Sequence, residues 1–174
     1  MKTETTLFIL CGEAFAGKST MSKKLAEKYN LKIVGRDAVY FSLKETLALD
    51  ETPEEDDEEL WSHLWPVAVQ GAKNQLFLGN SVVFDDNCLY KKQREELYVL
   101  AEKLNAKKIL IYLDIPTETL RQRKEENKKN PTRHDVPSAW LDEDHEIFER
   151  PTQDEQPLVF DGQTEIEEWI KRFE

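Results

Sequence analysis

Five short apolar runs, rich in β-branched and aromatic residues, recur along the chain. Most of them are near-continuous rather than alternating, which is typical of strands that are covered on both faces of a parallel sheet. The pattern therefore predicts five buried strands, at residues 5–11, 31–34, 81–84, 108–113 and 157–160.

Longer stretches with helical periodicity separate these runs. The predicted helices cover residues 18–29, 37–49, 54–78, 91–104, 117–128, 138–148 and 163–173. Pro66 falls inside the third of them and predicts a kink or a break there. Strands that alternate with helices form βαβ units with right-handed crossovers. The expected fold is a three-layer α/β domain with a five-stranded, mostly parallel sheet, and such sheets bind ligands at the carboxyl ends of their strands.

Length and composition are those of one globular domain over residues 1–174, with 39% hydrophobic and 34% charged residues. The net charge of −11 argues against broad affinity for nucleic acid or acidic membranes. No apolar run approaches the roughly 20 residues that span a bilayer, and the first strand begins too early for a signal peptide. Cys11 and Cys88 are expected to pack rather than to form a disulfide, which fits a cytoplasmic location. The three histidines show no metal-ligand spacing and are expected to be structural or exposed.

One motif follows the first predicted strand directly. Residues 12–19 read G-x-x-x-x-G-K-S and lead into a predicted helix, which is the context that phosphate binding requires. The glycines allow a tight turn whose amides point at an anion, at the positive end of the helix dipole. An ordinary strand-to-helix turn is the alternative. The motif predicts that a nucleoside triphosphate is bound by Gly12, Glu13, Ala14, Phe15, Ala16, Gly17, Lys18, Ser19 and Thr20.

Two residues of this motif, and one after the third predicted strand, have expected roles in phosphoryl transfer. Lys18 would reach the β- and γ-phosphate oxygens and act in catalysis, and the Ser19 hydroxyl would ligate Mg²⁺. The third strand ends in V-F-D-D, and an apolar strand that ends in a carboxylate is the Walker B arrangement for the same metal ion. Asp85 is preferred as the metal ligand because it follows the last strand residue. Asp86 and a simple turn role are left open.

Further polar and aromatic residues are candidates for the acceptor side. Asp37, after the second predicted strand, would lie across the cleft from the phosphates, where a carboxylate orients a hydroxyl acceptor and takes its proton. Capping of the next helix is its alternative role. Arg36 could contact the acceptor or be solvated, and Arg94 could face an anionic acceptor. Trp61 and Trp65 share one helical side, where packing is expected and an acceptor pocket is the alternative.

A basic segment follows the fourth predicted strand of this acidic chain. Residues 121–133 carry six Lys and Arg residues against two Glu. A mobile lid with arginines neutralises charge on a transferring phosphate and excludes water, whereas a solvated helix face is the alternative. Arg121 and Arg123 cannot both point the same way on a helix, so only one is expected to serve. The lid is expected to cover about residues 117–137, with Arg133 as a further phosphate ligand.

With these residues in hand, the chain resembles the small P-loop kinases grouped around phage-type polynucleotide 5′-hydroxyl kinase, zeta toxins and chloramphenicol phosphotransferase, with their AAA-type ATP-binding domain. The resemblance covers most of the chain. It includes the motif at 12–19, the Asp37 segment, V-V-F-D-D-N at 82–87 with Arg94 downstream, L-D-I-P at 113–116 with Arg121, D-V-P at 135–137 and F-E-R-P at 148–151. It implies ATP and Mg²⁺, transfer of the γ-phosphate to a hydroxyl, Asp37 as the base, and Arg121 on the lid.

The leading functional hypothesis is an ATP-dependent phosphotransferase that acts on a hydroxyl of a small molecule or nucleotide. A polynucleotide 5′-hydroxyl is the alternative acceptor. It is not favoured, because polynucleotide kinases are expected to have a basic residue three positions after Asp37, where this chain has Tyr40. A regulatory NTPase that acts on a protein partner is the alternative from another class, and a toxin-like kinase is a third. No membrane partner is expected, and the oligomeric state is left open.

Overall fold

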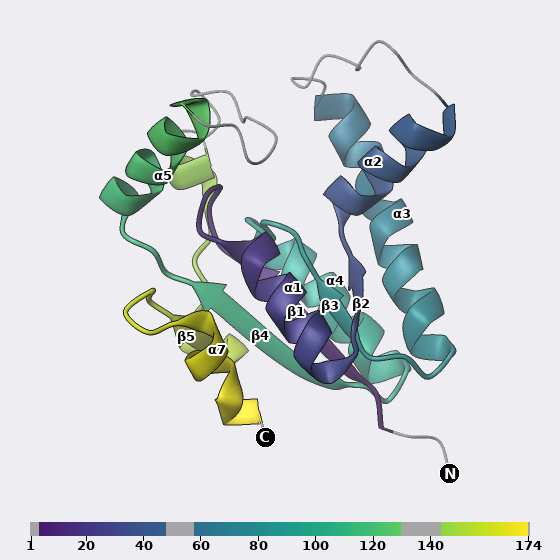
Figure 1. Cartoon of the computed structure of the whole chain (residues 1–174). Helices are drawn as coiled ribbons and strands as arrows, with labels where there is room; N and C mark the ends of the chain where they lie inside the picture. The colour runs from purple at the N-terminus through teal and green to yellow at the C-terminus, as the bar shows by residue number, and fades with distance from the viewer. Residues whose placement is uncertain (1–3, 48–57, 130–143, 174) are drawn as a thin grey trace.

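The computed structural model describes residues 4–47, 58–129 and 144–173. At its centre lies a five-stranded sheet in which every neighbouring pair of strands is parallel (Figure 1). The spatial order is β2-β3-β1-β4-β5, so the first strand lies in the middle of the sheet. The predicted strands are confirmed to within a residue at each end, as β1 Thr6–Cys11, β2 Lys32–Val34, β3 Val82–Phe84, β4 Lys107–Leu113 and β5 Leu158–Phe160.

Helices connect the strands and differ from the predictions in two places. The predicted helix at 163–173 is only partly α-helical, because its second half tightens into a 3-10 helix. Pro66 lies inside a continuous helix, so the break predicted there is absent. The helices are α1 Lys18–Tyr29, α2 Arg36–Leu47, α3 Glu58–Phe77, α4 Lys91–Lys103, α5 Thr117–Lys129 and α7 Ile166–Trp169, with 3-10 helices η1 Gln153–Glu155 and η2 Ile170–Phe173 and a helical turn at 144–147.

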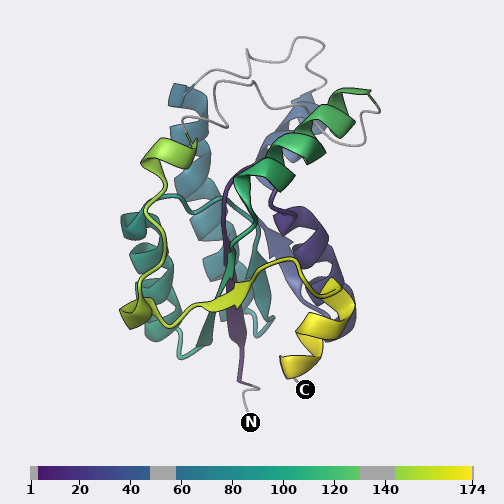
Figure 2. The same ribbon diagram turned by 90° about the vertical axis from the view of Figure 1, so that its left-hand side faces the viewer.

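Strand β1 divides the core into two halves, because successive side chains of a strand point to opposite faces of its sheet. Phe8 and Leu10 belong to a buried cluster with side chains of α1, α7 and η2. Leu7, Ile9 and Cys11 belong to a second cluster with side chains of α3 and α4. Figure 2 shows the resulting three layers, with α1 and α7 on one side of the sheet and α4 on the other. The three-layer α/β fold is therefore confirmed.

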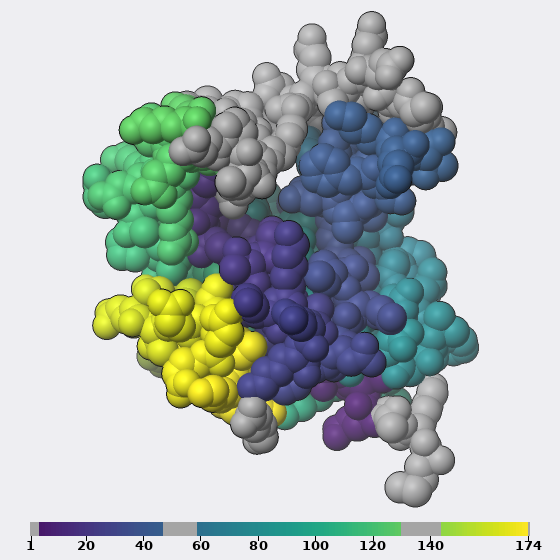
Figure 3. Space-filling model, viewed as in Figure 1, coloured from purple at the N-terminus to yellow at the C-terminus, as the bar shows by residue number. Residues whose placement is uncertain are grey.

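The carboxyl ends of the five parallel strands meet at one end of the molecule. There α5 rises on one side, and α2 with α3 rises on the other, so that the turn after β1 lies between them (Figures 1 and 3). The start of β1 and helix η2 lie at the opposite end. The groups predicted to act together thus come from loops at one edge of the sheet, as expected for a parallel α/β fold.

Candidate functional site

The turn between β1 and α1 adopts backbone conformations that its glycines make possible. Gly12 has φ of 149° and Gly17 has φ of 100°, both in the region that favours glycine. A Cβ atom on Gly12 would lie 2.9 Å from the carbonyl oxygen of Leu113, so the turn approaches β4 as closely as its backbone allows. Phe15 also has a positive φ, of 66°. The chain therefore folds back sharply over the start of α1.

The side chains of this turn face the protein interior. Ala14, Phe15 and Ala16 are buried in the cluster formed with α1, and the Glu13 side chain is buried as well. The first N–H groups of a helix have no partner within the helix. Backbone amides at the start of α1 are consequently the groups that the turn offers to an anion, together with the positive end of the helix dipole.

Lys18, the first residue of α1, folds its side chain back over the turn. Its Nζ donates hydrogen bonds to the carbonyl oxygens of Gly12 at 3.0 Å and Glu13 at 2.7 Å. The residue is only 8% exposed. A positive charge is thus held at the centre of the turn by neutral acceptors, which a more strongly attracting phosphate can replace.

Asp85 follows β3 directly and lies against the first two turns of α1. Ser22 Oγ donates a hydrogen bond to its Oδ2 at 2.7 Å, and the nearby Ser19 side chain also acts to lower the pKa of this carboxylate. Burial raises the pKa of Asp85 above its ordinary value, although the Ser22 hydrogen bond and the Lys18 ammonium oppose the shift. The Ser19 hydroxyl and the Asp85 carboxylate are hard oxygen ligands of the kind that Mg²⁺ prefers.

Asp86 has a different partner, although it is the next residue. The guanidinium of Arg36 donates to both carboxylate oxygens, from Nε to Oδ2 at 2.7 Å and from Nη2 to Oδ1 at 2.5 Å. This carboxylate raises the pKa of Arg36 against the opposing effect of burial. The guanidinium also lies 5.7 Å from the centre of the Trp65 ring. The pairing with Asp86 occupies Nε and Nη2 of Arg36, and a contact of Arg36 with the acceptor stays a prediction.

Gly35 brings the second and third strand ends together. A Cβ atom at this position would lie 2.0 Å from the carbonyl oxygen of Asp85, so no other residue fits without moving the turn. The Asp85 amide donates to the carbonyl oxygen of Val34 at 2.7 Å. Asp37, two residues further, keeps an exposed surface but is crowded by the protein groups around the strand ends. This partial loss of hydration, then the carboxylates of Asp86 and Asp85, raise its pKa, and Lys18 and Arg36 lower it by less.

On the other side of the turn, Arg123 of α5 contacts the phosphate-binding backbone. Its Nη1 donates to the carbonyl oxygens of Phe15 and Ala16, each at 3.1 Å. Arg121, which was predicted to serve, is exposed and lies on a different side of the helix. The structure therefore places Arg123 against the turn at residues 12–17, and the role of Arg121 stays a prediction. Arg133 and the end of the predicted lid, residues 130–137, lie outside the described residues.

Arg94, predicted to face an anionic acceptor, lies instead inside the protein. Its side chain is 0% exposed and donates to both carboxylate oxygens of Glu155, at 2.8 and 2.9 Å. It also donates to the carbonyl oxygen of Cys88 at 3.0 Å. Tyr98 Oη donates to the same carboxylate at 2.8 Å. A guanidinium so enclosed fastens η1 to α4, and it does not reach an acceptor.

The segment around the helical turn at 144–147 contacts residues that follow β1 and β3. His145 Nδ1 lies 2.9 Å from Glu13 Oε2. Asn87 Nδ2 donates to Asp144 Oδ2 at 3.2 Å. The Glu149 amide donates to the carbonyl oxygen of Leu89 at 2.9 Å. These contacts join the chain that follows the expected lid to the ends of β1 and β3.

Sequence reasoning missed two residues that the site uses, Ser22 and Gly35, and left the choice between Arg121 and Arg123 to the fold. Ser22 lies three positions after Ser19, so both side chains are on the same side of α1. A serine among apolar residues on that side could have been recognised from the sequence. Gly35 lies between the end of a strand and the charged residues Arg36 and Asp37. A glycine at such a place often marks a close approach of another backbone segment. Arg123 was recognised as one of two options, but the choice between them depends on how α5 is rotated. That rotation is set by packing and has no local signal.

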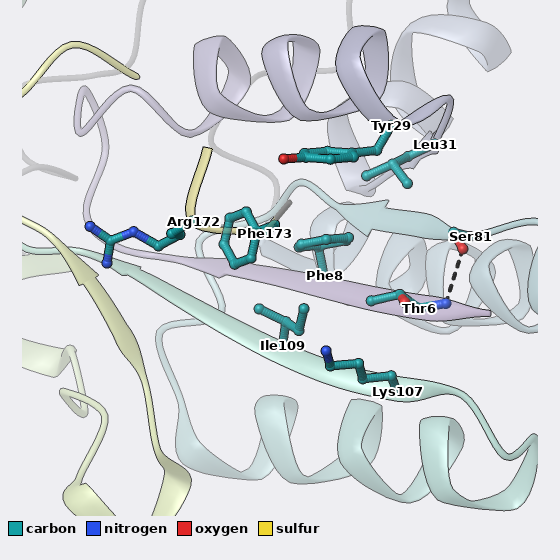
Figure 4. Close-up of a pocket in the computed structure, with 9 residues that line it drawn as sticks. All are labelled: Thr6, Phe8, Tyr29, Leu31, Ser81, Lys107, Ile109, Arg172 and Phe173. Atoms are coloured by element: carbon teal, nitrogen blue, oxygen red, sulfur yellow. Dashed lines mark hydrogen bonds between the residues drawn. The ribbon is translucent and has the colours of Figure 1, made fainter. Parts of the chain in front are cut away.

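A separate cavity of about 340 Å³ opens at the other end of the sheet (Figure 4). Its lining includes Thr6 and Lys107, the first residues of β1 and β4, with Phe8, Tyr29 and Phe173. The Thr6 amide donates to Ser81 Oγ at 3.0 Å beside it. Because it lies at the amino ends of the strands, this cavity is remote from the turn at residues 12–17. It is not part of the candidate site.

Comparisons with known proteins agree with this geometry. A family model described as an AAA domain (AAA_33) matches residues 7–151, and the chain belongs to this P-loop kinase-like family. Among curated protein sequences, none matches the chain significantly. Within the described parts of the chain, no helix is both long and apolar enough to cross a membrane.

Solved structures resemble the chain over nearly its whole length. A sugar kinase from Janibacter sp. has a TM-score of 0.69 at 20% identity, covering 97% of this chain and 92% of that one. A gluconokinase from Sinorhizobium meliloti has a TM-score of 0.63 at 18% identity, covering 98% and 90%. Kti12 from Chaetomium thermophilum, solved with ADP-AlF3, has a TM-score of 0.74 at 13% identity, covering 96% of each chain. The fold is that of nucleotide-binding P-loop proteins, kinases among them.

Proposed function

We propose that this chain is an ATP- and Mg²⁺-dependent kinase that transfers the γ-phosphate of ATP to a hydroxyl group of a small molecule. The observation that carries the proposal is the meeting of three strand ends. Lys18 closes the turn after β1, Asp37 follows β2 with a raised pKa, and Asp85 follows β3 beside Ser19. An anion site, a metal-ligand pair and a carboxylate base in one place are the parts that phosphoryl transfer to a hydroxyl needs.

On the donor side, the triphosphate lies along the backbone of residues 12–17 and the start of α1. Lys18 exchanges its two carbonyl partners for phosphate oxygens, since a charge-assisted hydrogen bond is stronger than one to a neutral carbonyl. Arg123 approaches from α5, where it already touches the same turn. Two cations then face the charge that spreads over the transferring group.

The residues present fit a magnesium ion. Mg²⁺ uses one or two carboxylates together with waters and substrate phosphates, rather than an all-protein cage. Among the described residues there is no cluster of three acidic, His or Cys ligands. Ser19 and Asp85 would hold the ion, and Asp86 would not, because Arg36 occupies it. When bound, Mg²⁺ neutralises charge on the β- and γ-phosphates.

On the acceptor side, Asp37 is the base. Its carboxylate orients the acceptor hydroxyl and takes the proton as the oxygen forms a bond to the γ-phosphorus, while the bond from that phosphorus to ADP breaks. The raised pKa of Asp37 makes it a better proton acceptor than an ordinary aspartate. The acceptor is a small molecule in this proposal, and a cytoplasmic location stays a prediction.

The experiment that tests the proposal follows phosphate transfer from labelled ATP to a library of hydroxyl compounds. Asp37→Asn is expected to lower the rate about 10²–10⁴-fold, the usual contribution of a general base. Its ATP affinity, measured by calorimetry, is expected to stay unchanged. Asp161→Asn, an exposed change after β5, is the matched control and keeps full activity. Full activity of Asp37→Asn would contradict the role of Asp37, and no transfer to any acceptor by the wild-type protein would contradict the function.

A second candidate function is a nucleotide-dependent regulator that acts on a protein partner. The similarity to Kti12, a protein not named as a kinase and solved with ADP-AlF3, supports it. This function predicts ATP hydrolysis without an acceptor and strong stimulation by a partner protein. Hydrolysis that rises with a small hydroxyl compound, with the phosphate recovered on that compound, supports the kinase instead.

A further inference from the structure

The described residues of α2 and α3 carry few positive charges near Asp37. Arg36, the first cation of α2, gives its guanidinium to Asp86. The next one, Lys44, lies two helical turns beyond Asp37, about 10 Å along the axis. On α3 the only lysine is Lys73, about 18 Å along that helix from Trp61. Arg94, predicted to meet an anionic acceptor, is enclosed with Glu155.

Carboxylates are found where the acceptor hydroxyl must lie. Asp37 is exposed at the start of α2, and the pairing of β2 with β3 brings the ends of the two strands, with Asp85 and Asp86, beside it. The cations opposite, Lys18 and Arg123, contact the turn that receives the phosphates. The guanidinium of Arg36 balances the charge of Asp86, and a metal ion held by Asp85 would balance that carboxylate, so Asp37 is the charge that an anionic acceptor would meet. A phosphate or carboxylate beside the reacting hydroxyl would be repelled by Asp37, and more strongly near a protein surface than in water.

Aromatic side chains continue the same face of α2 beyond Asp37. Tyr40 lies one turn further, and its ring centre is 5.4 Å from that of Trp61 on α3 and 5.3 Å from that of Phe41. Phe41 is 46% exposed. Tyr40 is only 6% exposed, and its buried Oη finds no hydrogen-bond partner among the described residues. A buried hydroxyl without a partner is costly, and in native proteins it calls for a reason such as a ligand.

We propose that the acceptor is an uncharged or cationic hydroxyl compound with an apolar face. It lies along α2 with its reacting hydroxyl at Asp37 and a second polar group hydrogen bonded to Tyr40 Oη. This inference rests on the proposed kinase function and adds the class of substrate to it. The arrangement excludes nucleotides and 5′-hydroxyl polynucleotides as preferred acceptors, because no described cation of α2 or α3 near Asp37 is available to their phosphates.

The test compares matched acceptors that differ in charge, using the full chain with Mg²⁺ and ATP. Suitable sets are a sugar with its amino and acidic derivatives, a nucleoside with its monophosphate, an aminoglycoside and a 5′-hydroxyl oligonucleotide. We expect kcat/KM for the neutral or cationic member to exceed that for the anionic member by about tenfold or more. An equal or higher value for the anionic members overturns the inference and leaves the kinase function standing. No phosphorylated acceptor at all, with ATP affinity intact, overturns both.

A second arm tests Tyr40. Tyr40→Phe removes one oxygen and is expected to raise the acceptor KM about three- to tenfold, the loss of one net hydrogen bond, with the KM for ATP unchanged. Because the buried hydroxyl has no partner without the acceptor, the variant should be at least as stable as the wild type. Tyr29→Phe is the control: its Oη bonds to the Ile170 carbonyl at the far end, so stability falls and KM stays constant. An unchanged acceptor KM in Tyr40→Phe overturns the role of Tyr40.

Discussion

At the scale of single residues, Asp37 has its ionisation set by its neighbours. Partial loss of hydration and the carboxylates of Asp86 and Asp85 raise its pKa, so the base is protonated at a higher pH than an ordinary aspartate. Transfer needs the ionised form. The rate is therefore expected to fall as the pH is lowered, with its acid limb above the ordinary aspartate range, and a pH profile of kcat/KM measures this.

The same shift has a consequence for stability with the opposite sign. A carboxyl group whose pKa is raised in the folded state binds its proton more tightly there than in the unfolded chain, so its ionised form destabilises the fold above that pKa. Asp37→Asn should consequently have a Tm no lower than that of the wild type at neutral pH. In the pH profile of kcat/KM, the acid limb that Asp37 causes should disappear. A variant that melts clearly lower would show that the carboxylate is stabilising, contrary to its environment.

Gly35 determines how closely two strand ends approach. Because a Cβ atom would lie 2.0 Å from the Asp85 carbonyl oxygen, Gly35→Ala must push the β2–α2 turn away from β3. We expect a loss of about 1–3 kcal/mol in the free energy of unfolding, measured with urea, and at least a tenfold loss of transfer, because Asp37 moves with the turn. Gly71→Ala in α3, whose Cβ would meet only Val34 Cγ1 at 3.4 Å, is the matched control. Equal effects from the two changes would contradict the special role of Gly35.

At the scale of secondary structure, α5 presents two arginines on different sides. Arg123 bonds to carbonyl oxygens of the phosphate-binding turn, whereas Arg121 is exposed. Arg123→Ala is expected to lower kcat/KM for ATP about 10²–10³-fold, as removal of one preorganised donor does. Arg121→Ala should have a much smaller effect in the same steady-state assay. The reverse order would restore the assignment that the sequence resemblance implied.

Two predicted acceptor ligands are paired with carboxylates in the fold. Arg36 follows β2, and Arg94 lies on the helix after β3, which made each a candidate for the acceptor side. In the fold each meets a carboxylate first, Asp86 after β3 and Glu155 in η1. Both pairs are partly or fully buried, where removal of one partner leaves an unpaired charge. Their role is to position strand ends and helices around the site.

At the scale of the whole molecule, nucleotide binding and folding are expected to be linked. The phosphate-binding turn belongs to the core through Ala14, Phe15 and Ala16, so a ligand that needs this turn binds only the folded chain. Mg²⁺ and ATP at about 100 times Kd should add about 2.7 kcal/mol of stability, or about 5–10 °C in Tm for a chain of this length. Thermal unfolding with and without ligand measures the shift. Lys18→Ala should reduce it strongly, and a shift that survives this change would place the nucleotide elsewhere.

Much of this architecture was readable before any coordinates were known. The five apolar runs predicted all five strands, because burial on both faces requires continuous apolar sequence. The pattern at 12–19 predicted its turn, because glycines permit the positive φ angles that Gly12 and Gly17 adopt. The alternation of strands and helices predicted a parallel sheet. It also predicted that the site lies at the carboxyl ends of the strands. These features depend on local chemistry, and the sequence by itself determined them.

The remaining features depend on partners that are distant in the sequence. Asp85 and Asp86 are neighbours in the chain, yet one meets Ser19 and Ser22 and the other meets Arg36. The choice between Arg121 and Arg123, and the enclosure of Arg94, follow from how helices rotate and pack on the sheet. Such pairings arise from many weak contacts over long separations, and no single residue type encodes them. Only the tertiary structure decided which charges meet, and hence which of them are left for a ligand.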